Sequence, residues 1–138
     1  MNFEHSKKTK ELISLVSNFI EDRVKPREKE YSDSMEAFRE SGNPWQVPQV
    51  LYELKKEAKD QGLWNFSLTG ELGYGLTNLE FAPLAEMMGV GWTSEVFNSS
   101  APDAGNMEVL DKYGSEYQKD RWLTPLLNGE IRSAFAMT

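Results

Sequence analysis

The amino-acid sequence predicts an all-α fold, an orthogonal bundle of about six helices that ends in one β-strand. Apolar residues recur at helical spacing along most of the chain, and capping residues stand where these patterns begin and end. Only residues 131–138 alternate with a period of two. A length of 138 residues, of which 39% are hydrophobic, is sufficient for one domain with a buried core. We therefore assign residues 1–129 to a helical domain and residues 130–138 to the first strand of a following β-domain.

The first predicted helix covers residues 6–31. Ser6 suits the N-cap position, and Pro26 is expected to kink the helix or to end its regular part. The apolar stripe of this helix consists of Leu12, Leu15, Val16, Phe19, Ile20 and Val24. Residues 32–47 contain glycine, asparagine and proline, and they are predicted to form a loop or a short broken helix.

The second and third predicted helices are bounded by proline, glycine and a capping box. Pro48 opens the second helix, because a missing N–H costs nothing at a helix start, and Gly62 ends it. Thr77 and Glu80 form a capping box at the start of the third helix, and Pro83 is expected to distort that helix locally. The loop between the two helices contains Gly70, Gly73 and Gly75. Their spacing differs from the dinucleotide-binding fingerprint, which favours an ordinary interhelix loop.

Two short helices and a longer one are predicted in the last third of the chain. The short helices cover residues 94–100 and 106–113. Ser115 and Gln118 form a second capping box, and the helix that it opens ends at the Asn128–Gly129 turn. The apolar stripe of this last helix consists of Trp122, Leu123, Leu126 and Leu127.

The final segment, residues 131–138, has the alternation of a β-strand. A single strand has no ladder partner, and an unpaired strand edge is prone to aggregation. We therefore expect the rest of the sheet to lie beyond Thr138 or in another chain, or to be absent. This interpretation predicts that the chain is not a complete enzyme.

The composition excludes several classes of function. The formal net charge is −7, from 15 basic and 22 acidic residues, and no basic cluster suggests a nucleic-acid partner. The absence of cysteine excludes disulfides, thiol nucleophiles and thiolate metal sites. His5, the single histidine, is expected to face solvent, so we predict neither a metal site nor a catalytic residue. No signal peptide or membrane-spanning stretch is evident, which predicts a cytoplasmic protein.

Two groups of residues are open to both a structural and a functional interpretation. The polar residues between positions 98 and 106 are typical of helix caps, and the alternative is that they form a pocket wall. Phe135, Met137 and Thr138 belong either to an ordinary core strand or to one side of a planar cofactor. Periodicity does not decide between these alternatives.

Four segments of the chain resemble acyl-CoA dehydrogenases. They are NLEFAPLAE at 78–86, PDAGNMEVL at 102–110, YGSEYQK at 113–119 and WLTPLLNGEIRSAFAMT at 122–138. The last two are similar to the family patterns YG-[ST]-E-x-QK and WL-x-PLL-x-GEIRS-x-F-x-MTEP. The resemblance spans nearly the whole chain and is weakest over residues 32–48.

The resemblance implies the fold and the chemistry of that family. Its members have a helical first domain, a middle β-domain and a C-terminal helical bundle, and they oxidise acyl-CoA to 2-enoyl-CoA. A glutamate removes the α-proton and FAD accepts a hydride from the β-carbon, but no residue of this chain matches that glutamate. The resemblance also implies that residues of this chain contact the two ligands. They are Phe135, Met137 and Thr138 beside the flavin, and Phe97, Ser100 and Ala101 beside the acyl chain.

The main hypothesis is therefore the N-terminal domain of an FAD-dependent acyl-CoA dehydrogenase, with weak or no FAD binding and no activity by itself. Its expected partners are acyl-CoA, the two missing domains and further copies of the complete protein in a homo-oligomer. One alternative is a non-enzymatic helical interaction module, or a gene relic, whose C-terminal strand pairs with a partner's sheet. Another alternative is a relative of the acyl-CoA oxidases, which share the architecture and pass electrons to oxygen.

Overall fold

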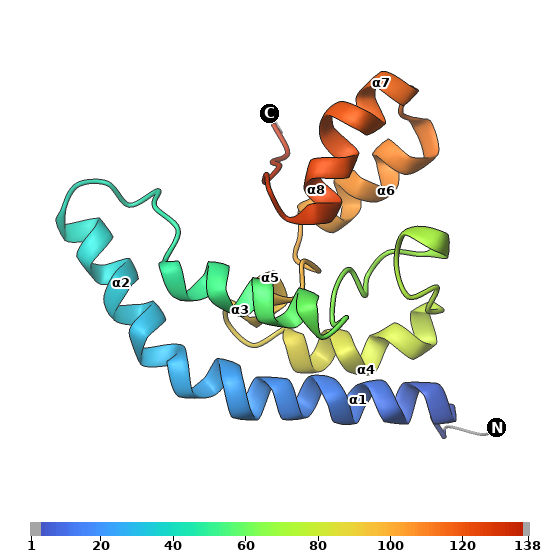
Figure 1. The fold of residues 1–138 in the computed structure, drawn as a ribbon, viewed down its shortest axis with the longest axis horizontal. Coiled ribbons are helices and arrows are strands. Elements are labelled where there is room, and N and C mark those ends of the chain that lie inside the picture. The colour runs from blue at the N-terminus through green and yellow to red at the C-terminus, as the bar shows by residue number, and fades with distance from the viewer. Residues whose placement is uncertain (1–3, 137–138) are drawn as a thin grey trace.

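The computed structural model describes residues 4–136, and for Glu71 it describes the backbone alone. All regular structure in this range is helical, which confirms the all-α prediction. Figure 1 shows α1, α3 and α4 packed together and α6, α7 and α8 gathered in a separate lobe beside the C-terminus. The α-helices are α1 (Lys7–Phe19), α2 (Glu28–Glu40), α3 (Gln49–Asp60), α4 (Asn78–Met88), α5 (Thr93–Val96), α6 (Asp103–Tyr113), α7 (Glu116–Gln118) and α8 (Thr124–Asn128).

Tighter and wider helical turns connect some of these elements. A π-helical turn (Ile20–Val24) and a 3-10 turn (Lys25–Arg27) join α1 to α2, so the chain stays helical through Pro26. Pro26 lacks an N–H donor, and the two turns accommodate this by a Lys25 N–H bond to Ile20 O and a Glu28 N–H bond to Lys25 O. Further turns are a 3-10 turn (Gly70–Leu72) and a π-helical turn (Lys119–Leu123) between α7 and α8.

The prediction of a loop or a short broken helix over residues 32–47 is wrong for residues 32–40, because α2 continues to Glu40, and it is confirmed for residues 41–47, which form a loop. None of the residues of α2 is fully buried, and its apolar residues Tyr31, Met35 and Phe38 form a short, partly buried stripe that the sequence interpretation missed. Ion pairs along its surface also support it. Lys29 pairs with Asp33 at 2.6 Å, and Arg27 pairs with Glu30 at 2.8 Å.

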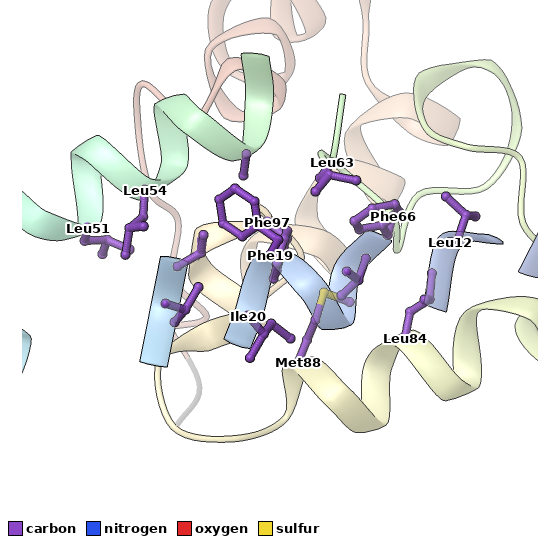
Figure 2. Close-up of a cluster of buried hydrophobic side chains, with 14 of the residues drawn as sticks. Leu12, Phe19, Ile20, Leu51, Leu54, Leu63, Phe66, Leu84, Met88 and Phe97 are labelled. Atoms are coloured by element: carbon purple, nitrogen blue, oxygen red, sulfur yellow. The ribbon is translucent and has the colours of Figure 1, made fainter. Parts of the chain in front are cut away.

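The main hydrophobic core lies between α1, α3, α4 and α5, and Figure 2 shows its side chains. Phe97, which follows α5, occupies its centre and is completely buried. Its ring lies 5.5 Å from that of Phe19 on α1 and 6.0 Å from that of Phe66 in the loop after α3. A second, smaller cluster fills the lobe of α6 and α8 and consists of Leu68, Met107, Leu123 and Leu126.

The predicted helix ends are confirmed where the signal is local. Both capping boxes form, with Thr77 accepting from Glu80 N–H and Ser115 accepting from Gln118 N–H. Gly129 ends α8 with a positive φ of 71°, a conformation that glycine adopts without strain.

The predicted C-terminal strand is absent from the described residues, and Arg132–Ala136 forms an irregular tail instead. A β-strand requires backbone hydrogen bonds to a neighbouring strand, and alternation of residues alone does not supply them. Met137 and Thr138 lie outside the described residues. Between residues 4 and 136, no helix combines the length and the apolar character that crossing a membrane requires.

Two buried asparagines connect the two hydrophobic clusters. Asn98 donates from Nδ2 to Asn65 Oδ1 at 2.7 Å and to Leu126 O at 3.0 Å. Asn65 donates from Nδ2 to Leu127 O at 3.1 Å, and its backbone N–H donates to Phe97 O at 3.0 Å. Both asparagines have positive φ, 58° for Asn65 and 51° for Asn98, which few residue types other than glycine tolerate. The pair therefore ties the loop after α3, the end of α5 and the end of α8 to one another.

We expect Asn98→Ala to lower the free energy of unfolding by roughly 2–4 kcal/mol, because it leaves Asn65 Oδ1 and Leu126 O without this donor and places alanine at positive φ. Asn98→Gly removes the same amide without the backbone strain and should cost less. Asn43→Ala, in the exposed loop after α2, is the control and should change stability by less than about 0.5 kcal/mol. Urea unfolding measures all three, and a value for Asn98→Ala equal to the control contradicts the role of the pair.

We expect acid to weaken the start of α4. The pKa of Glu80 lies below its usual value because its carboxylate accepts from Thr77 N–H and from the Thr77 hydroxyl. A lowered folded-state pKa gives stability above the unfolded-state pKa, and this stability is lost as the pH falls through the folded-state value. The stability difference between the protein and Glu80→Gln should therefore shrink between about pH 6 and about pH 3. Urea unfolding of both proteins across this range checks the trend, and a constant difference contradicts it.

Candidate functional site

The C-terminal tail is fixed to the start of α6 by one arginine and two carboxylates. Arg132 Nε donates to Asp103 Oδ2 at 2.5 Å, and Arg132 Nη1 donates to Glu95 Oε2 at 2.8 Å. The Asp103 side chain is only 3% exposed, whereas that of Arg132 is 41% exposed. Asp103 is the first residue of α6, where the helix dipole favours a negative charge. We call this group of Glu95, Asp103 and Arg132 the tail clamp.

Ser133 adds a second set of bonds to the same carboxylate. Its backbone N–H donates to Asp103 Oδ1 at 2.7 Å, and its hydroxyl donates to the same oxygen at 2.6 Å. Asn106 Nδ2, one turn further along α6, donates to Ser133 Oγ at 2.8 Å. Asp103 thus accepts from a guanidinium, a backbone amide and a hydroxyl, and these bonds determine both the position and the direction of the tail.

The tail clamp places Phe135 beside α6 with much of its ring in solvent. The residue is 58% exposed, and a Cβ built on Gly105 would lie 3.8 Å from the ring. The small residue at position 105 therefore leaves the ring next to the helix backbone. An exposed aromatic ring on a positioned tail is suited to contact a planar or apolar group.

Two of the residues predicted to contact an acyl chain, Ser100 and Ala101, directly precede α6. Ser100 is partly buried, Ala101 is exposed, and Ser100 O accepts from Ala104 N–H at 3.1 Å. Phe97 differs, because its side chain is completely enclosed by the core of this chain. The structure therefore brings Ser100, Ala101 and Phe135 to the first turn of α6, whereas Phe97 packs against Phe19 and Phe66 in the main core.

The sequence interpretation did not identify the tail clamp. Asp103 was assigned to a polar cluster that favoured helix caps, and Arg132 lies 29 residues away from it along the chain. An acidic residue directly after Pro102 is a local signal for a helix start with a fixed carboxylate, but the helix was predicted to begin at residue 106, whereas α6 begins at Asp103. Its partner becomes visible only in three dimensions.

A groove on the surface of the main core lies away from the residues of the predicted site. This groove of about 300 Å³ lies between the π-helical turn after α1 and the α4–α5 loop, beside the stacked rings of Tyr31 and Trp92. It includes none of the residues predicted to bind FAD or an acyl chain. Among the described residues, no three His, Cys, Asp or Glu side chains gather as metal ligands would. His5 is exposed, as the sequence predicts.

The fold and the tail clamp together define a helical domain whose C-terminal tail is held at a fixed position on the surface of the domain. Residues 6–130 match the acyl-CoA dehydrogenase N-terminal domain. The chain therefore belongs to the acyl-CoA dehydrogenase family, as the sequence motifs indicated.

Individual relatives agree with this assignment. The chain is 45% identical over 144 residues to the "Probable acyl-CoA dehydrogenase FadE2" of Mycobacterium tuberculosis, an alignment that covers 100% of this chain and 33% of that protein. It is 46% identical to acyl-CoA dehydrogenase family member 10 of Mus musculus, covering 94% of this chain and 12% of that protein. A solved structure from Mycobacterium abscessus, assigned to the same family, has a TM-score of 0.89 and 46% identity, covering 98% of this chain and 35% of that one. The chain thus spans about a third, or less, of the length of these relatives.

We expect Asp103→Ala to release the tail, because the substitution removes the acceptor for Ser133 N–H and for Arg132 Nε. Amide hydrogen exchange at Ser133 should become at least about tenfold faster, which corresponds to the loss of one charge-assisted hydrogen bond. Glu95→Gln removes only the more exposed part of the tail clamp, and it should change exchange at Ser133 by less than about threefold. Amide hydrogen exchange measured by NMR distinguishes the two variants. An exchange rate at Ser133 that is unchanged in Asp103→Ala contradicts the proposed role of the tail clamp.

Proposed function

We propose that the chain is the N-terminal part of an FAD-dependent acyl-CoA dehydrogenase that oxidises acyl-CoA to 2-enoyl-CoA. Membership of the family supports the reaction class. The observation that carries the proposal is the tail clamp, because Asp103 and Arg132 hold the chain at a fixed position where it leaves the helical domain. In the complete protein, this geometry determines where the following segment meets the substrate and the cofactor.

The residues that precede α6 and the residues of the tail have separate roles in this proposal. Ser100 and Ala101 form part of the wall beside the acyl chain, and Phe97 supports that wall from within the core. Phe135, Met137 and Thr138 lie along one edge of the flavin. Of these three, Phe135 is described, and its exposed ring fits a planar apolar group. When bound, FAD supplies the hydride acceptor of the reaction.

No residue of this chain is proposed as the catalytic base. A general base that works near neutral pH needs a carboxyl pKa raised toward that range. Among the described residues, the carboxyl groups of Glu30, Glu57 and Glu80 have displaced pKa values, and all three are lowered, by hydrogen bonds from Arg27, from Arg23 and from Thr77 respectively. Glu95 and Asp103 are bonded to Arg132 in the tail clamp. The base is therefore proposed to come from another part of the complete protein.

The remaining parts of the proposal follow from the family. The substrate is an acyl-CoA in fatty acid metabolism, and the complete protein is a cytoplasmic homo-oligomer. The partners of this chain within that protein are a β-domain and a C-terminal helical domain.

We expect the purified chain to be colourless after incubation with FAD and gel filtration, and to show no acyl-CoA-dependent reduction of an electron acceptor. The reason is that the proposed flavin surface here is one edge only and that the base is supplied elsewhere. The absorbance spectrum and a dye-reduction assay measure both properties. Bound flavin together with turnover contradicts the proposed division of roles.

A chimeric protein (the graft) provides a test in which activity is expected. In this graft, the 138-residue chain replaces the matching segment of the M. tuberculosis relative, and the unmodified relative is the control. The graft should bind FAD, and the flavin should bleach when a suitable acyl-CoA is added. If the unmodified relative responds to acyl-CoA while a folded, flavin-bound graft does not, the proposed contribution to the active site is contradicted. The alternative hypothesis, a non-enzymatic interaction module, predicts a different result. In that case the tail of the free chain pairs with the sheet of another protein, and the resulting complex neither binds flavin nor reacts with acyl-CoA.

A further inference from the structure

A small cationic hollow lies between α3 and the turn that follows α8. Its volume is about 200 Å³, and its walls are three lysines and Tyr52 of α3, Trp64, and the Asn128–Gly129 turn. None of these residues belongs to the proposed acyl or flavin surfaces. The chain as a whole is acidic, so a concentration of lysines around one hollow differs from the rest of the molecule.

The three lysines have different partners. Lys56 pairs with Asp60 at 2.5 Å, which is the ordinary arrangement on an exposed helix face. Lys55 and Lys59 have no carboxylate within 4.0 Å among the described residues. Lys59 donates to the backbone oxygen of Asn128 at 3.2 Å and to Asn128 Oδ1 at 3.3 Å. Lys55 lies over the Trp64 ring, 5.7 Å from its centre, and Lys59 lies 5.5 Å from the same centre.

The walls of the hollow are held in place before any ligand arrives. Lys55 and Lys59 are four residues apart on α3 and therefore project from the same face of the helix. Trp64 Nε1 donates to Leu127 O at 2.7 Å, which fixes the indole against the end of α8. Gly129 allows the turn to approach that ring, because a Cβ at this position would lie 2.8 Å from Trp64 Cζ2.

Lys55 is the lysine of the hollow whose surroundings shift its pKa. Lys55 is partly buried, and its pKa is lowered first by this burial and then by the positive charge of Arg132, with a smaller effect of Lys59. Glu95 and Asp103 oppose this shift, but both carboxylates are already bonded to Arg132. A ligand that brings negative charge into the hollow would therefore meet two ammonium groups, those of Lys55 and Lys59, that form no ion pair among the described residues.

We propose that this hollow binds a phosphate group between Lys55 and Lys59, against the indole of Trp64. A phosphate offers several oxygen acceptors to two ammonium groups, and lysine is a common phosphate ligand. The volume is smaller than the roughly 300–1,000 Å³ of pockets that enclose whole drug-sized ligands, so the hollow fits the phosphate and not a complete nucleotide. The site is independent of the proposed dehydrogenase activity.

The test is an NMR titration of the 138-residue chain with inorganic phosphate at constant ionic strength. The reporters are the Trp64 indole Nε1–H, assigned with Trp64→Phe, and the amides of Asn128 and Gly129. We expect saturable shifts confined to these groups. Lys55→Gln and Lys59→Gln should each raise the dissociation constant by about tenfold or more, since each removes a charge-assisted hydrogen bond.

Matched variants separate a site from a general charge effect. Lys29→Gln makes the same charge change on α2, where Lys29 pairs with Asp33, and it should leave the affinity within about twofold. Lys55→Arg keeps the charge and should retain saturable binding, while thermal unfolding confirms that each variant is folded. Linear, unsaturable shifts, or equal weakening by Lys29→Gln and Lys55→Gln, overturn the proposal.

A second titration with a phosphate monoester, adenosine 3′,5′-bisphosphate, distinguishes the source of the phosphate. Saturation by inorganic phosphate supports a site for the free ion. Saturation by the monoester alone supports a site for the phosphate group of a larger ligand. If neither compound saturates the reporters, the proposal is wrong.

Discussion

The buried asparagine pair Asn65–Asn98 is the interaction on which the arrangement of the two lobes depends. The main core and the smaller cluster around α6 and α8 are separate hydrophobic units. Hydrophobic contact alone is non-directional and does not set one unit relative to another. The asparagine amides supply that direction, because they donate to the carbonyl oxygens of Leu126 and Leu127 at the end of α8. These carbonyls lie in the last turn of α8, where helix carbonyls lack ordinary helical partners; Leu126 O also accepts from Gly129 N–H at 2.9 Å, and Leu127 O also accepts from Trp64 Nε1 at 2.7 Å.

The position of the tail follows from this junction. Asn98 fixes the end of α5, and the chain runs from there through Ser100 to the start of α6 at Asp103. The same pair fixes the end of α8, from which Gly129 turns and Glu130 N–H bonds back to Pro125 O at 2.9 Å. Asp103 and Arg132 therefore approach each other from two segments that the asparagines have already placed. The geometry of the tail clamp therefore depends on the buried asparagine pair.

The sequence predicted those features whose cause is local. The capping boxes at Thr77 and Ser115 and the glycine at position 129 act over a few residues, and the structure confirms them. Helix α2 was missed beyond Tyr31 because its apolar stripe of Tyr31, Met35 and Phe38 is short and only partly buried, and ion pairs supply further support. The predicted strand is absent from residues 131–136, the part of it that the structure describes, since alternation describes one strand and a sheet requires two. Phe97 was assigned to a ligand surface from its position in the family pattern, but its burial depends on Phe19 and Phe66, which no local signal connects to it.

The tail clamp and the lysine hollow are electrostatically connected. Glu95 and Asp103 are the carboxylates that raise the pKa of Lys55, yet both form their hydrogen bonds with Arg132. The arginine is the better partner for them, because its planar group donates to both carboxylates at once while remaining charged. Lys55 is left partly buried beside Trp64 without a bonded counter-charge. Both carboxylates thus stay with Arg132, and the positive charge of the hollow comes from its own lysines. Lys55 and Arg132 lie far apart in the sequence, yet they act on the same two carboxylates and are parts of one electrostatic unit.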